Sequence, residues 1–119
     1  MQQDNRYKLI EETLLKEADL QIERAESQGE KAFYELFKSA LLKKYKDSYD
    51  SDLQRGEVSK ETVDKCIDFL FSNACVNFRS LPNIDDSIKE DVIGQARKAL
   101  GSWKAMVKKM LIDRGVRVL

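Results

Sequence analysis

The sequence predicts an all-α protein: a single domain, residues 1–119, folded as an antiparallel, up-and-down bundle of four helices. Charged residues make up 35% of the chain, which has only one proline and five glycines, a composition that favours helix. Apolar residues recur at helical spacing in four segments, and no segment shows a convincing strand alternation. Because the connections are short, successive helices are expected to be antiparallel neighbours.

The first helix is expected over residues 4–28. One face gathers its apolar residues: Tyr7, Ile10, Leu14, Leu15, Ala18, Ile22 and Ala25. Leu9 and Leu20 fall on the opposite face, among the charges. Gly29 interrupts the pattern and suits a helix end.

The second helix is expected over residues 30–50, with Arg55-Gly56 as the following turn. Its apolar face consists of Phe33, Leu36, Phe37, Ala40, Leu41 and Tyr45. An acidic stretch from Asp50 to Glu61 has some of the spacing of a calcium-binding EF-hand loop. Since Arg55 stands where that loop needs glycine, the stretch is interpreted as a polar turn.

The third helix is expected over residues 60–79, with Ser59 as its N-cap and Pro82 beyond its end. It is the most apolar segment and therefore predicted to be the most buried: Val63, Cys66, Ile67, Leu70, Phe71, Ala74 and Phe78. Cys66 and Cys75 lie nine residues apart on opposite faces, about 13 Å along the axis, too far for a disulfide. Both are interpreted as reduced thiols with a packing role.

The fourth and longest helix is expected over residues 84–114, capped by Asn83 and ended by Gly115, with residues 116–119 as a short tail. Trp103 lies near the centre of its apolar arc and is predicted to be in the core. The rest of the arc comprises Ile88, Val92, Ile93, Ala96, Ala99, Leu100, Met106, Val107, Met110 and Leu111.

The sequence contains no residue pattern typical of a catalytic site or a metal-binding site. The chain has no histidine, which removes the usual general base at neutral pH and most catalytic zinc sites. Adjacent carboxylates such as Asp85 and Asp86 diverge by about 100° on a helix and do not converge on one substrate. The glycines have no phosphate-binding spacing. The sequence therefore predicts no enzyme, no cofactor and no bound metal.

Charge is unevenly distributed along the chain. Residues 95–119 contain seven basic residues and one acidic residue, so residues 1–94 carry a net charge of −6 in a neutral chain. On the fourth helix Arg97, Lys104 and Lys108 form one row, and Lys98 and Lys109 form a second. Small residues lie between the rows: Gly94, Gly101 and Ala105. Two interpretations stay open, a solvated face that complements the helix dipole or a surface that binds a partner.

A second candidate surface is apolar. Phe69 and Val76 share the less apolar side of the third helix, as Leu9 and Leu20 do on the first. Two interpretations stay open for these four residues. Either neighbouring helices cover them, or the residues form a docking patch or a homodimer interface.

The expected function is that of a small non-enzymatic adaptor or regulator. It would bind another protein, or a second copy of itself, through Arg97, Lys98, Lys104, Lys108 and Lys109, or through Phe69 and Val76. The alternative is a nucleic-acid-binding protein whose basic helix contacts phosphates. No segment has the pattern of a secretory signal or the roughly 18 apolar residues of a membrane span, which favours a cytoplasmic protein without a membrane partner.

Overall fold

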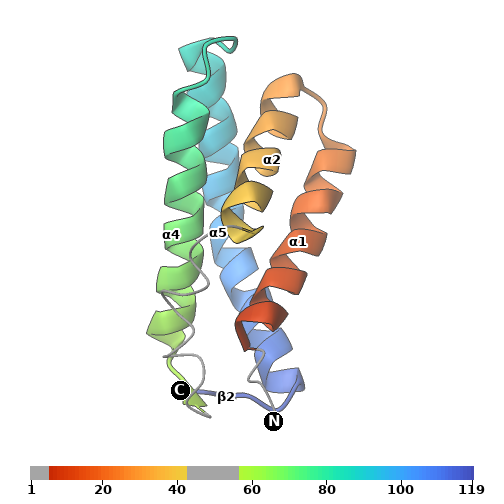
Figure 1. The fold of residues 1–119 in the computed structure, drawn as a ribbon, viewed down its shortest axis with the longest axis vertical. Helices are drawn as coiled ribbons and strands as arrows, with labels where there is room; N and C mark the ends of the chain where they lie inside the picture. Colours follow the sequence, from red (N-terminus) through yellow and green to blue (C-terminus); the bar gives the residue numbers. More distant parts are fainter. Residues whose placement is uncertain (1–5, 43–56) are drawn as a thin grey trace.

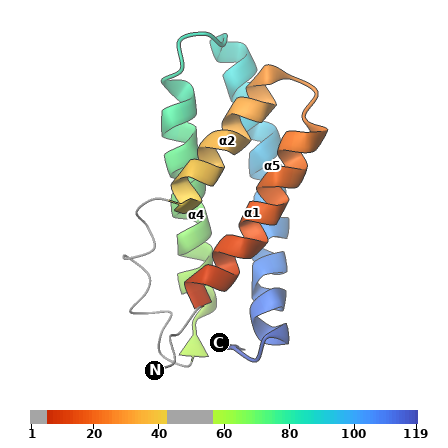
Figure 2. The ribbon, with the colours of Figure 1, turned by 45° about the vertical axis from the view of Figure 1, so that its right-hand side comes forward.

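The computed structural model describes residues 6–42 and 57–119, which form four helices and two very short strands. The helices are α1 (Arg6–Arg24), α2 (Gln28–Leu42), α4 (Lys60–Arg79) and α5 (Asp86–Asp113); the strands are β1 (Glu57–Val58) and β2 (Arg117–Val118). Successive helices run in opposite directions, and α2 lies between α1 and α4 (Figures 1 and 2). Since α5 packs against all three other helices, this is the predicted up-and-down four-helix bundle.

Local capping signals place two helix ends as predicted. The hydroxyl of Ser59 accepts a hydrogen bond from the Thr62 amide at 3.0 Å, and α4 begins at the next residue, Lys60. Gly115 has a φ of +87°, and the amide of Val116 donates to the carbonyl of Leu111 at 2.9 Å. This pattern is a Schellman motif, which favours glycine because a Cβ is strained at positive φ. Ser59 is therefore confirmed as an N-cap, whereas the C-cap of α5 is Arg114 and Gly115 is the residue after it.

The predicted Asn83 cap is wrong, because residues 82–84 form the turn and Asp85 holds the N-cap position of α5. The helix consequently spans Asp86–Asp113 rather than 84–114.

The prediction for Gly29 is also wrong. The first helix ends at Arg24, before residue 28, and Gly29 is a buried residue in the first turn of α2. Ser27 precedes that helix, and its hydroxyl accepts a hydrogen bond from the Glu30 amide at 3.2 Å. A Cβ on Gly29 would lie 3.3 Å from Ile88 Cγ2 and 3.5 Å from Val92 Cγ2 on α5. Gly29 therefore allows α2 to pack closely against α5, and it does not end a helix.

Several expectations fall on residues 43–56 and lie outside the described residues: the end of the second helix at residue 50, the turn at Arg55-Gly56, and most of the EF-hand-like stretch.

The last residues do not form a simple tail. Strand β2 pairs in parallel with β1, joining Glu57 to Arg117 and Val58 to Val118, and the Lys60 amide donates to the Leu119 carbonyl at 2.7 Å. Val116, between α5 and β2, is buried. Two-residue strands are too short to produce a readable alternation in the sequence, so the pairing was not anticipated.

The core is centred on aromatic rings from three helices. Phe33 of α2 lies 5.8 Å from Phe71 and 5.4 Å from Phe78 of α4, and Trp103 of α5 lies 5.4 Å from Phe37, measured between ring centroids. Trp103 is only 3% exposed, which confirms its predicted place in the core.

Most residues of the predicted helix faces whose side chains the structure describes are buried or half-buried, but three residues differ from the expectation: Ile88, Leu9 and Leu20. Ile88, expected in the core, is exposed near the start of α5. Leu9, expected among the charges, is half-buried against the core, because α1 is packed on both α2 and α5. Within residues 6–42 and 57–119, no helix combines the length and the apolarity needed to cross a membrane.

Candidate functional site

The structure divides the basic residues of α5 into two groups. Lys104 Nζ lies 2.7 Å from Asp68 Oδ1, and Lys108 Nζ lies 2.7 Å from Asp64 Oδ1, so both lysines pair with α4. Their side chains are only 22% and 24% exposed. The Arg97 guanidinium lies 5.6 Å from the centroid of the Phe71 ring, also on α4. This inner row is thus engaged within the molecule and stabilises the packing of α5 on α4.

These two ion pairs were not predicted, although the sequence contains a signal for them. Asp64 and Asp68 are four residues apart, as are Lys104 and Lys108, so the two pairs match when the helices run antiparallel.

Lys98 and Lys109 belong to a different surface, the solvent-facing side of α5. Lys98 is exposed, and Lys109, 81% exposed, has Asp113 at 3.8 Å as a weak ion-pair partner. Helical spacing places both on one side with four further residues: Gly94, Gly101, Ala105 and Ile112. These six residues are called the outer α5 face. A Cβ added to Gly94 or Gly101 would have no neighbouring atom within 4 Å.

The predicted apolar residues do not form one patch. Phe69 and Val76 are exposed on α4, whereas Leu9 and Leu20 are half-buried on α1. Helix α2 lies between α1 and α4 (Figures 1 and 2). Exposure of Val76 excludes the interpretation that neighbouring helices of the described chain cover it.

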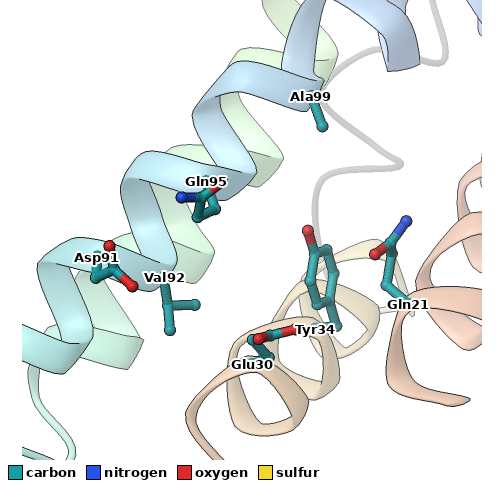
Figure 3. Close-up of a pocket in the computed structure, with 7 residues that line it drawn as sticks. All are labelled: Gln21, Glu30, Tyr34, Asp91, Val92, Gln95 and Ala99. Atoms are coloured by element: carbon teal, nitrogen blue, oxygen red, sulfur yellow. The ribbon is translucent and has the colours of Figure 1, made fainter. Parts of the chain in front are cut away.

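A cavity of about 400 Å³ opens between α1, α2 and α5. Its lining is mostly polar: Gln21, Glu30, Tyr34, Asp91, Val92, Gln95 and Ala99 (Figure 3). None of these side chains was predicted to belong to a site. These residues come from three helices, and none of them interrupts the spacing of apolar and polar residues in its own helix. The spacing within single helices therefore does not predict the cavity.

Tyr34 is the most buried polar side chain of this cavity. The residue is 7% exposed, and its ring contacts Phe33 and Trp103 at centroid distances of 5.2 and 6.0 Å. Burial raises its pKa to about 12, and the negative charges of Glu30 and Glu17 act in the same direction. Its hydroxyl is therefore neutral at physiological pH.

Lys89 is a buried cation outside the predicted sites. Its Nζ donates a hydrogen bond to the Arg79 carbonyl at 2.9 Å, at the end of α4, and lies 3.6 Å from Asp86. Arg79 in turn donates two hydrogen bonds to Glu90, at 3.0 and 3.2 Å, which hold the pKa of that carboxyl below its ordinary value. These contacts join the two ends of the α4–α5 turn, and they account for Lys89 as a structural residue.

Both thiols are free and lie inside the bundle. Burial raises the pKa of Cys66 to about 12 and raises that of Cys75, although Arg79 and Arg97 partly oppose the second shift. A nucleophilic cysteine needs the opposite shift, toward the thiolate.

We predict that neither thiol reacts readily with iodoacetamide at neutral pH in the folded protein. Alkylation should become complete only after denaturant is added, because the reagent needs an accessible thiolate. Mass spectrometry of the intact chain measures the number of alkyl groups. Stoichiometric labelling of either cysteine before unfolding would contradict the prediction.

In the described part of the chain, residues 6–42 and 57–119, no three histidine, cysteine, aspartate or glutamate residues are grouped so that they could hold a metal ion. Comparison with known protein families, curated proteins and solved structures gives no match.

Proposed function

We propose that this chain is a small non-enzymatic adaptor or regulator that binds another protein through the outer α5 face. The observation that carries the proposal is the pair of glycines at the solvent-facing side of a long helix. A glycine inside a helix costs roughly 0.5–1 kcal/mol relative to alanine. Packing within the described chain does not use the missing Cβ atoms of Gly94 and Gly101. The absence of a Cβ at both glycines would allow the backbone of a partner to approach α5 closely.

The chemistry of this face suggests the nature of the partner. Lys98 and Lys109 are eleven residues apart, about 16 Å along the helix, so acidic side chains at similar spacing on a partner helix would match them. Ile112, exposed at the same side, adds apolar contact. Phe69 and Val76 on α4 are proposed as a second contact region.

A binding function also agrees with the chain's chemistry. The chain has no histidine, and its two thiols are protonated at neutral pH because burial raises their pKa. Free thiols without a disulfide also support the cytoplasm as the compartment.

The test is a charge reversal, Lys98→Glu with Lys109→Glu. Partners captured from the native cell would be identified by mass spectrometry, and the affinity of the main partner measured by calorimetry. The double reversal is expected to weaken binding at least tenfold, or about 1.4 kcal/mol, because two favourable ion pairs become repulsive. Sedimentation of the purified chain shows whether the partner is a second copy.

The matched control is Lys16→Glu with Lys31→Glu, two exposed lysines on α1 and α2. This control should keep the affinity within about twofold. Reversal of Lys104 and Lys108 is unsuitable, since it would break the pairs with Asp68 and Asp64 and destabilise the bundle. Unchanged binding of the Lys98/Lys109 variant would refute the proposed face.

We further predict that Gly94→Ala and Gly101→Ala each stabilise the isolated protein by about 0.5–1 kcal/mol. The effects should add, because the sites are seven residues and about 10 Å apart on one helix. Urea denaturation measures the gain, and the double variant should bind the partner more weakly. A loss of stability in either variant would mean that the bundle itself needs the glycine.

The nucleic-acid alternative is a weaker proposal for one specific reason. Two lysines of the basic helix already have carboxylate partners on α4, so fewer free cations face solvent than the sequence suggests. Binding to phosphates would weaken steeply with added salt, whereas mixed apolar docking would not. A mobility-shift assay with DNA and RNA at low salt separates the two.

A further inference from the structure

The solvent-facing side of α5 carries opposite charges toward its two ends. Lys109 is 81% exposed near the end of the helix, and Asp91 is exposed near its start, beside the outer α5 face. They are eighteen residues apart, or about five helical turns, so they lie on the same side of α5 and about 27 Å apart. Within residues 6–42 and 57–119 the Asp91 carboxylate has no ion-pair partner, and Lys109 has only Asp113 at 3.8 Å. Both charges are thus open to a partner.

This charge pattern is complementary to itself when two copies of α5 lie side by side in opposite directions. In such a pair each residue faces the residue at an equal distance on the other side of the two-fold axis. An axis level with residue 100, midway between the two charges, brings Asp91 of each copy opposite Lys109 of the other. Parallel packing would bring like charges to the same level. Charge complementarity therefore favours an antiparallel pair with two identical ion pairs.

The surface between the two charges leaves room for a second helix. Gly94 of one copy would lie close to the level of Ala105 of the other, and the two Gly101 residues would lie next to the axis. A Cβ added at either glycine would meet no atom of its own chain within 4 Å. Figures 1 and 2 show α5 behind α2, at the back of the bundle. The methylene chain of Lys98 could then lie across the glycine backbone of the other copy.

We propose that the chain forms a two-fold symmetric dimer in which the outer α5 faces of two copies pack antiparallel, flanked by two Asp91–Lys109 ion pairs. The inference rests on the proposed function, because it uses the same face and names a second copy of the chain as its partner. The chain has no net charge, so overall repulsion does not oppose self-association. Ile112, 57% exposed, adds apolar contact. Since one helix per copy makes a small interface, the expected dissociation constant is roughly 10–100 μM.

Sedimentation equilibrium of the full chain at physiological salt measures this dissociation constant. Two single variants, Asp91→Lys and Lys109→Asp, test the ion pairs. Each variant turns both pairs into contacts between like charges, so each should self-associate at least tenfold more weakly, with a dissociation constant above about 100 μM to 1 mM.

Mixing the two single variants separates a lost ion pair from damage to the fold. In the mixed dimer the new lysine of one variant faces the new aspartate of the other, and the native Lys109 faces the native Asp91. Both ion pairs return, so the mixture should form a dimer with a dissociation constant within about threefold of that of the unmodified chain. The double variant Asp91→Lys with Lys109→Asp should dimerise in the same way. A merely structural effect of either substitution would not be reversed by mixing.

The matched controls are Glu35→Lys and Lys31→Asp, which make the same changes of charge at exposed residues of α2 and should leave self-association unchanged. The inference is overturned if the unmodified chain stays monomeric at millimolar concentration, if either single variant dimerises as the unmodified chain does, or if mixing restores no dimer. A monomeric chain that captures a different protein through Lys98 and Lys109 would overturn the dimer and support the proposed function. The two ideas therefore fail separately.

Discussion

Replacing Trp103 with alanine is expected to lower the free energy of unfolding by about 3–5 kcal/mol. The indole is almost fully buried and contacts Phe37, Tyr34 and Phe71, so its loss leaves a cavity between α2, α4 and α5. Domains of this size are stable by only about 5–15 kcal/mol, so the variant would be close to unfolding at 37 °C. Urea denaturation followed by far-ultraviolet circular dichroism measures the change without needing the tryptophan.

The matched control is Trp103→Phe, which keeps an aromatic ring and should lose less stability than the alanine variant. A cost below about 1 kcal/mol for Trp103→Ala would contradict the burial described, because truncation of an exposed side chain has effects of that size or smaller.

The second large effect is expected in alkaline solution. In the folded protein burial raises the pKa of Cys66 from 9.0 to about 12. Below pH 9 both states keep the thiol proton, and its full contribution to stability is present. Above pH 9 the unfolded chain releases the proton while the folded chain retains it, so stability falls until about pH 12. A three-unit shift corresponds to a loss on the order of 4 kcal/mol.

Tyr34 also makes the folded protein less stable as the pH rises, over the narrower interval from pH 10 to about pH 12. The reason is that burial raises its pKa from 10.0 to about 12. Melting temperatures measured between pH 8 and about pH 11, short of chemical damage to the chain, give the slope. The slope should be shallower in Cys66→Ala, and shallower again when Tyr34→Phe is added. An unchanged slope in the double variant would show that other groups cause the alkaline loss.

The pairing of α4 with α5 changes how the basic end of the chain is interpreted. Basic residues without acidic neighbours in the sequence suggested a surface reserved for a partner. Asp64 and Asp68, some forty residues earlier, take two of those lysines as internal partners. The outer α5 face, which we propose as the partner-binding surface, keeps Lys98 and Lys109 exposed, and a Cβ added at Gly94 or Gly101 would meet no atom within 4 Å.

Helix number, polarity of each face and several helix ends were determined by the sequence itself. These features depend on contacts within one turn of helix: apolar residues repeat every three or four positions, Ser59 caps an amide three residues ahead, and Gly115 adopts a positive φ at the end of α5. Such local interactions are the same in any tertiary arrangement, so the sequence alone predicts them.

Only the tertiary structure decided which residues meet across helices. The fit of Gly29 against Ile88, the Lys104–Asp68 pair and the cavity around Tyr34 all depend on the rotation and axial position of one helix relative to another. Periodicity specifies the apolar side of a helix but not its offset along a neighbour, and a shift of one turn, about 5.4 Å, would pair different residues. The candidate sites therefore required the packed bundle, whereas the fold class did not.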